Sequence, residues 1–173
     1  TVYCSKIANG EHSICHNFDD SFGNIVYERM KHNWKGNACL YCNASRKVYD
    51  RGEEAETYAY NFIHPKMDKH WIMNQEYDLI IGSPPYQTYD DGGTGASAKP
   101  VYQKFIDKAK EVNPRYLSMI IPARWYSGGK GLDEFRESML ADRNIRRIVD
   151  YVDARDCFPS ASGLAGGICY FIR

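Results

Sequence analysis

The stretch YDLIIGSPPYQ, residues 77–87, places the strongest constraint on what this chain can fold into. Its first half is a short continuous apolar run that ends at Gly82, and such a run predicts a strand buried on both faces of a mostly parallel sheet. Two prolines follow, and proline cannot continue the hydrogen-bond ladder of a central strand. We therefore expect a strand that stops at a rigid corner.

The sequence after this corner alternates between helical and strand patterns. Apolar residues recur at helical spacing from Val101 to the break at Asn113, and residues 116–121 form a second apolar run before Pro122. A second helix carries Leu132, Phe135, Met139 and Leu140 on one face, and the segments IRRIVDYV and GGICYFI read as two further strands. This order predicts an open α/β sheet, in which the last strand can run antiparallel.

Composition changes near residue 76. Residues 1–76 are polar and aromatic with little periodicity, whereas residues 77–173 alternate cleanly, so we expect two regions of different character. The 22 Lys and Arg residues equal the 22 Asp and Glu residues, so any contact with nucleic acid must come from local patches. No apolar run is long enough to span a membrane and no signal peptide is recognisable, which predicts a cytoplasmic protein without membrane partners.

The corner itself has the chemistry of a hydrogen-bond acceptor. Pro84 and Pro85 have no N–H groups, so the corner offers the Ser83 hydroxyl and the carbonyls of Ser83 and Pro84, followed by the flat face of Tyr86. A planar ring that carries an amine fits this arrangement, because its two N–H groups meet acceptors while the ring stacks on the tyrosine. The alternative is a simple Pro-Pro turn with Tyr86 as a half-buried core aromatic.

The motif DLIIGSPPYQ resembles the catalytic motif of S-adenosylmethionine-dependent amino-methyltransferases of DNA. The stretch from GGTGASAKPVYQKF to RESML, and the terminal CFPSASGLAGGICYF, are similar to the adenine-N6 methyltransferases of restriction-modification systems. The resemblance implies a Rossmann-like methyltransferase sheet and direct methyl transfer to a base that is flipped out of double-stranded DNA. On this basis Ser83 and the Pro84 carbonyl hold the amine, Pro85 stiffens the corner, and Tyr86 clamps the ring.

The resemblance also suggests residues near the cofactor. Asn17 falls where the family usually has an acid beside the adenine of the cofactor, and Tyr102 and Phe105 match the helix that walls its methionine end. The alternatives are a turn residue for Asn17 and a packed helix face for Tyr102 and Phe105. Arg124 and Lys130, near the mouth of the site that the resemblance implies, are candidates for contacts with the DNA phosphate backbone, against the alternative of solvated loop charges.

Two departures from the family pattern affect the expected activity. No glycine-rich cofactor loop precedes residue 77 and no target-recognition region follows, so we expect the remainder of the polypeptide, or a partner subunit, to supply them. Residues 1–76 then form the end of the cofactor half plus an irregular insertion, and residues 77–173 form the catalytic half. The second departure is Ser83 itself, since serine is normal in the cytosine-N4 branch; the alternatives to an adenine-N6 enzyme are therefore a cytosine-N4 enzyme or an inactive fragment that binds DNA or a partner chain.

The insertion contains one further motif. Cys39 and Cys42 in NACLYCNAS have the spacing of half a zinc site, and His32, His64 or a distant cysteine could complete the four ligands that zinc requires. The alternative is two free cysteines in a polar insertion. The six cysteines are scattered through the chain, so a disulfide framework is not expected.

Overall fold

The computed structural model of the chain describes residues 2–3, 25–26, 32–50, 59–64, 76–88, 98–159 and 166–173. The chain divides into two compact units. The N-terminal unit comprises Thr1–Met73 with Thr88–Ala98, and the C-terminal unit comprises Asn74–Gln87 with Lys99–Arg173. The assignment of residues 1–76 to a cofactor half and of residues 77–173 to a catalytic half stays a prediction.

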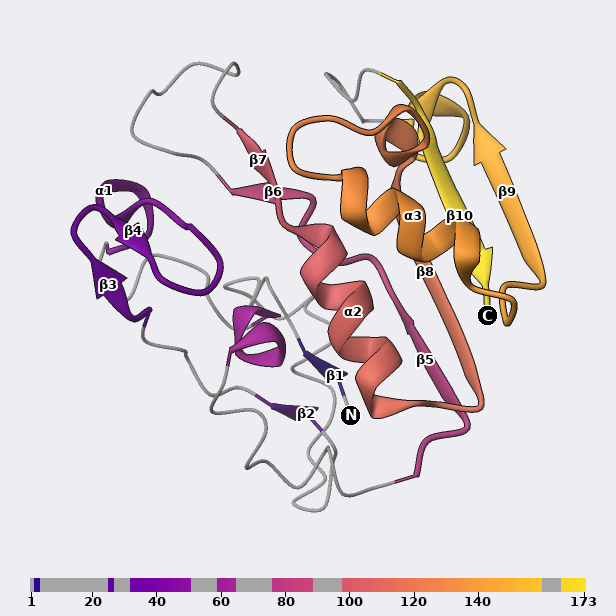
Figure 1. Cartoon of the computed structure of the whole chain (residues 1–173), viewed down its shortest axis with the longest axis horizontal. Helices are drawn as coiled ribbons and strands as arrows, with labels where there is room; N and C mark the ends of the chain where they lie inside the picture. Colours follow the sequence, from indigo (N-terminus) through magenta and orange to yellow (C-terminus); the bar gives the residue numbers. More distant parts are fainter. Residues whose placement is uncertain are drawn as a thin grey trace. The chain divides into compact units, whose positions relative to one another are not determined.

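A four-stranded mixed sheet forms the centre of the C-terminal unit (Figure 1). Its order is β5 (Leu79–Gly82), β8 (Tyr116–Pro122), β10 (Ile168–Ile172) and β9 (Arg147–Tyr151). β5 and β8 are parallel, whereas β10 is antiparallel to both of its neighbours. The predicted open α/β sheet is confirmed, and the last strand is antiparallel and inserted between β8 and β9.

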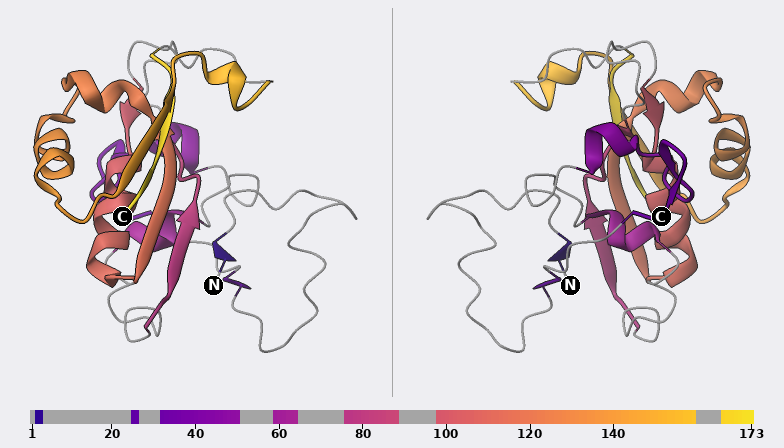
Figure 2. Two further views of the ribbon diagram at one scale, coloured as in Figure 1. Left: turned by 90° about the vertical axis from the view of Figure 1, so that its right-hand side faces the viewer. Right: turned by 90° about the vertical axis from the view of Figure 1, so that its left-hand side faces the viewer.

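Both helices of this unit, α2 (Tyr102–Val112) and α3 (Asp133–Ala141), cover the same face of the sheet (Figures 1 and 2). The alternation along β8 follows from this arrangement, because Leu117, Met119 and Ile121 are buried while the residues between them are partly exposed. α2 ends where Asn113 takes a left-handed conformation with φ of 54°, and its N–H bonds the carbonyl of Lys110.

Two predictions about burial are wrong. β5 is not buried on both faces, because Leu79 is 53% exposed and Ile81 is 74% exposed. Within the described part of the C-terminal unit, β5 is an edge strand and both helices lie on one face, so the other face is left open. On α3, Phe135 and Met139 are buried but Leu140 is 64% exposed, because it lies about 100° further round the helix than Met139.

The described residues of the N-terminal unit form short elements. β1 (Val2–Tyr3) pairs in parallel with β2 (Ile25–Val26), and β3 (Trp34–Lys35) forms a hairpin with β4 (Ala38–Cys39). The other elements described in residues 32–50 and 59–64 are α1 (Arg46–Tyr49) and the short 3-10 helix η3 (Ala59–Ile63). The prediction of an irregular insertion is not tested by these elements. Within the described ranges of the whole chain, no helix has the length and apolar character that crossing a membrane requires.

A partly buried carboxylate, Asp142, ties three parts of the C-terminal unit together. Asp142, directly after α3, accepts from Lys110 of α2 at 2.9 Å and from Arg173 after β10 at 2.8 Å. Its other oxygen accepts from the backbone N–H of Asn144 at 3.0 Å. Burial on its own would raise the pKa of Asp142, but these hydrogen bonds outweigh it and hold the pKa below the ordinary value.

We expect Asp142→Asn to lower the free energy of unfolding by about 2 kcal/mol, because two charge-assisted hydrogen bonds are weakened and two cations remain partly buried. Urea denaturation measures the change, with Glu137→Gln on the exposed face of α3 as the matched control.

The stabilisation by Asp142 should depend on pH, because the pKa of this carboxyl is lower in the folded state than in the unfolded state. The stabilisation is present above the unfolded-state pKa of about 4 and is lost as the pH falls through the folded-state pKa. The two proteins should therefore converge in stability in acid; equal midpoints at neutral pH would contradict the role of Asp142.

Candidate functional site

The Pro-Pro corner lies at the carboxyl end of β5. Gly82 pairs with Met119 in the parallel ladder, so β5 and β8 end at the same edge of the sheet. β8 leads into the 3-10 helix η6 (Ala123–Ser127) at that edge, just as β5 leads into Ser83. In open α/β sheets ligands bind at the carboxyl edge, and here the structure brings two loops with polar and aromatic residues to it.

Within the corner the acceptors are available. The side chain of Ser83 is exposed, Pro84 is buried and Tyr86 is half-buried. The Ser83 Oγ lies 3.4 Å from the hydroxyl of Tyr86, so the serine leans across the corner toward the tip of the ring. No described residue donates a hydrogen bond to the carbonyl of Ser83 or Pro84.

The aromatic end of the corner is fixed to the next helix. The backbone N–H of Val101 donates to the carbonyl of Tyr86 at 3.1 Å, which holds the corner beside the start of α2. Next to this bond, β6 (Gln87–Thr88) and β7 (Lys99–Pro100) form a short ribbon. Burial raises the pKa of Tyr86, the contact with Ser83 opposes this, and nearby Cys157 and Cys169 add to it. The ring is therefore a neutral phenol at physiological pH, with a face suited to stacking.

The predicted cofactor residues on α2 lie in the packed interior of the C-terminal unit. Tyr102 and Phe105 are buried, and the ring of Tyr102 meets the ring of Phe135 edge-on at 5.9 Å. The hydroxyl of Tyr102 has no hydrogen-bond partner in the part of the chain that is described. Burial and the proximity of Cys169 raise its pKa, which Arg124 partly opposes. Cofactor contact by Tyr102 and Phe105 stays a prediction, and Asn17 lies outside the described residues.

The sequence did not indicate the hydrogen bond between Trp125 and Cys169. The indole N–H of Trp125 donates to Cys169 Sγ at 3.4 Å, joining η6 to β10, and both residues are buried. The Trp125 ring also packs edge-on against Phe135 at 5.9 Å. The only sequence signal was an aromatic residue directly after a strand that ends in proline. The pair fixes the loop that carries Arg124.

The predicted DNA-backbone residues are both exposed. Arg124 lies on η6, and Lys130 lies in the glycine-rich loop before α3, where its φ of 51° is left-handed. Neither forms an ion pair with a described residue. Their position near the carboxyl edge of the sheet leaves them available to an anionic ligand, and contact with DNA stays a prediction.

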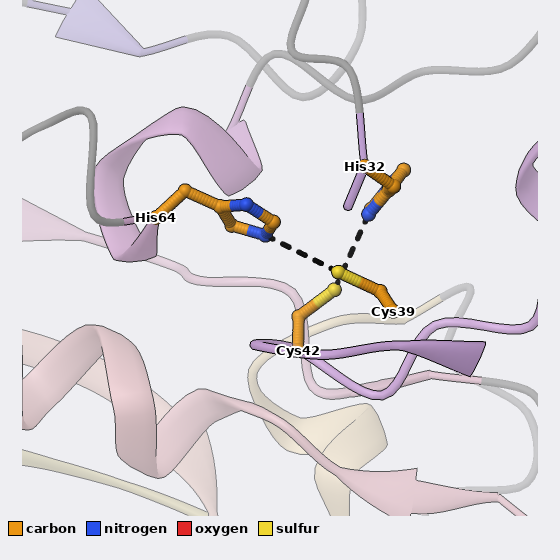
Figure 3. A group of neighbouring side chains, drawn as sticks. All are labelled: His32, Cys39, Cys42 and His64. Atoms are coloured by element: carbon orange, nitrogen blue, oxygen red, sulfur yellow. Dashed lines mark hydrogen bonds between the residues drawn. The ribbon is translucent and has the colours of Figure 1, made fainter. Parts of the chain in front are cut away.

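In the N-terminal unit, the structure places Cys39 and Cys42 beside two histidines. One potential ligand atom from each of His32, Cys39, Cys42 and His64 lies within 4.8 Å of all the others, and all four residues are buried (Figure 3). Hydrogen bonding, first from Cys42 and then from the two histidines, holds the pKa of the Cys39 thiol well below its usual range despite its burial. This cluster could hold a metal ion.

Comparisons with known proteins identify a family. A family model described as Eco57I restriction-modification methylase matches residues 1–158. The chain is also 35% identical to an uncharacterized adenine-specific methylase of Mycoplasma pneumoniae over 96% of its own length. It spans 41% of the length of that relative. No solved structure is matched.

The loop carrying Arg124 depends on Gly167, whose carbonyl accepts from the N–H of Ala123 at 3.1 Å. Gly167 has a φ of 74°, and a Cβ there would fall against the carbonyl oxygens of Tyr151 and Val152. We expect Gly167→Ala to destabilise the protein by about 2 kcal/mol or more, because a left-handed alanine would also collide with backbone.

Gly166→Ala is the matched control for this prediction. Gly166 also has a positive φ, 93°, but a Cβ there would meet no atom within 4 Å. The difference between the two variants in thermal or urea unfolding isolates the collision from the backbone strain. Equal losses in both variants would show that the close approach around Gly167 is not required.

Proposed function

Since the chain belongs to the Eco57I restriction-modification methylase family, we propose that the full-length protein transfers a methyl group from S-adenosylmethionine to N6 of adenine in double-stranded DNA. One observation carries the proposal. The corner of residues 83–86 presents two carbonyls without donors among the described residues, the Ser83 hydroxyl and a neutral aromatic ring at the carboxyl edge of a parallel strand pair.

The acceptors suit an exocyclic amine. The lone pair of such an amine is delocalised into the base, so the nitrogen is a weak nucleophile. Acceptance of its two hydrogens by the Ser83 Oγ and the Pro84 carbonyl localises the lone pair toward the methyl group, and this interaction is strongest in the transition state. S-adenosylmethionine, when bound, would supply the methyl group and leave as a neutral thioether. The corner's part would be to hold the amine toward that group, and the proton released from the methylated nitrogen would pass to solvent.

Tyr86 suits a base that has left the helix. A stacked base hides its amine, so an enzyme of this kind extrudes the base and replaces the lost stacking with an aromatic side chain. The bond from the Val101 N–H to the Tyr86 carbonyl holds the backbone that carries this ring, and Pro84 and Pro85 restrict the backbone before it. The ring is thus positioned before the base arrives.

The cofactor supplies a methyl group on a positively charged sulfur. Tyr102 is the first residue of α2, and the Val101 N–H just before it bonds the corner. The buried hydroxyl of Tyr102 has no hydrogen-bond partner among the described residues. It therefore fits a polar group at the methionine end of that cofactor. Phe105 lies one turn further along the same helix and would wall the apolar side. We assign the contact near the adenine of the cofactor to Asn17 by resemblance.

Ser83 favours a second candidate function, methyl transfer to N4 of cytosine. A serine has a shorter arm than the asparagine usual in the adenine branch, so an adenine amine would have to come closer or be reached through a water molecule. The similarity to an adenine-specific methylase favours adenine. A third candidate is a degenerate chain that binds DNA or a partner and transfers nothing.

The partners follow from the chemistry. We assign phosphate-backbone contacts to Arg124 and Lys130, which are exposed beside the corner. The rest of the polypeptide or a partner subunit would supply the glycine-rich cofactor loop and the recognition of a DNA sequence. A cytoplasmic location agrees with a reaction on chromosomal DNA.

The first test is transfer of a labelled methyl group from S-adenosylmethionine to DNA by the full-length protein. We expect Tyr86→Ala to lower the rate by about tenfold to a hundredfold, because base–aromatic stacking contributes about 1–3 kcal/mol. Tyr86→Phe is the matched control, since it keeps the ring and loses only the hydroxyl near Ser83. Equal losses in both variants would contradict a stacking role for the ring.

The second test identifies the target base by digesting the labelled DNA to nucleosides. We expect N6-methyladenine, and we expect Ser83→Asn to raise the rate several-fold, because the longer asparagine side chain reaches an adenine amine more closely than serine and a well-placed hydrogen bond contributes about 1 kcal/mol. Ser138→Asn, on the exposed side of α3, is the control. N4-methylcytosine as the product would favour the second candidate, and no transfer to any DNA by either the original protein or Ser83→Asn would overturn the enzymatic proposal.

A further inference from the structure

The local fold around Cys39 and Cys42 brings their sulfur atoms together. β3 and β4 are joined by a tight turn in which Gly36 has a φ of 65°, and Cys39 ends β4. The N–H of Asn43 then bonds the carbonyl of Cys39 at 2.9 Å, and the N–H of Cys39 bonds the carbonyl of Ala44 at 2.8 Å. Asn43 is left-handed, with a φ of 60°, a conformation that asparagine tolerates. The chain thus folds back, and both cysteines face one point.

The two histidines reach this point from other segments. His32 precedes β3 and His64 follows η3, and both rings are directed at the sulfur atoms (Figure 3). The Nδ1 of His32 lies 3.4 Å from Cys42 Sγ, and the Nε2 of His64 lies 3.9 Å from Cys39 Sγ. Four side chains from three segments therefore converge, which two separate thiol–imidazole hydrogen bonds would not require.

We propose that His32, Cys39, Cys42 and His64 bind one zinc ion that holds the N-terminal unit together. Zinc–sulfur bonds of about 2.3 Å and zinc–nitrogen bonds of about 2.0–2.1 Å place tetrahedral ligand atoms about 3.4–3.8 Å apart. The sulfur–nitrogen distances in the cluster, 3.4 Å between Cys42 and His32 and 3.9 Å between Cys39 and His64, are close to this range. Four protein ligands leave no open position on the ion, so the site is structural rather than catalytic.

The charges of the four side chains favour a bound zinc ion over two thiols and two imidazoles without a metal. Two thiolates balance the two charges of the ion and the imidazoles are neutral, so the bound site carries no net charge into its buried surroundings. His32 would bind through Nδ1, which leaves its hydrogen on Nε2, an atom without a partner among the described residues. The tautomer of His32 is thereby fixed by the geometry.

The surroundings of the site consist of aromatic rings. Trp34 and Tyr60 pack against His32 at 4.9 and 5.7 Å, and Tyr41 packs against His64 at 5.3 Å. These rings hold the imidazoles in place and exclude water from the cluster. Apart from the four ligands, the buried residues described between positions 32 and 64 are few, namely Ala44, Ser45, Ala59, Tyr60 and Phe62. A metal ion would link the segments that carry these residues.

The test is the metal content of the full-length protein, purified without chelator, and its absorption spectrum after zinc is replaced by Co²⁺. We expect about one zinc per chain and the visible bands of tetrahedral Co²⁺ with two thiolate ligands. Cys42→Ser should lose the bands. Cys157→Ser, a free and partly exposed cysteine in the C-terminal unit, is the matched control and should keep them.

A second pair of variants keeps the proposal testable if Cys42→Ser does not fold. His64→Cys replaces one ligand by another, so Co²⁺ should still bind and the sulfur-to-metal charge-transfer absorption should rise. His64→Ala should weaken binding by at least roughly tenfold, the smallest loss found when even a residue supporting a zinc ligand is removed. A folded protein that binds neither metal, a Cys39–Cys42 disulfide in the freshly purified protein, or unchanged Co²⁺ spectra in Cys42→Ser and His64→Cys would overturn the site. None of these readouts depends on methyl transfer.

Discussion

The two prolines after β5 determine much of what lies at the carboxyl edge of the sheet. They follow Gly82, the last residue of the parallel ladder with β8, and they bring no N–H group that could extend it. The carbonyls of Ser83 and Pro84 are consequently left without described donors. A regular continuation of the strand would have used the same carbonyls in sheet pairing, so the end of the ladder and the acceptor chemistry of the corner have one cause.

The two units are stabilised in different ways. The C-terminal unit buries the apolar faces of α2 and α3 on one side of a four-stranded sheet. Asp142, directly after α3, pairs with Lys110 of α2 and with Arg173 after β10. In the described part of the N-terminal unit, two cysteines and two histidines are buried together. The C-terminal unit is thus stabilised by apolar burial against a sheet, whereas the proposed metal would add directional bonds among side chains of the N-terminal unit.

Local patterns were enough to predict the order of strands and helices in the C-terminal unit and the corner after the first strand. The Leu79–Gly82 strand, the two helices and the existence of β10 follow from periodicity and from turn residues within a few positions. The antiparallel direction of β10 had been left as an option. Exposure was harder to predict, because Leu79 and Leu140 are apolar residues whose burial depends on which elements pack beside them. The Trp125–Cys169 bond joins residues 44 positions apart, and neither residue carries a local signal for the other. His32 and His64 could be named as candidate partners of the cysteine pair, but the convergence of all four required the tertiary fold.

The position of β10 has a consequence for the order in which the sheet can form. β10 supplies both ladders that connect β8 with β9, yet it is the last of the four strands to leave the ribosome. Until residues 168–172 emerge, β9 has no partner among the described strands, and β8 is paired on one side only. Unpaired strand edges promote association with other chains. Synthesis of this protein therefore includes an interval in which β5, β8 and β9 have been made but the strand that joins β8 to β9 has not.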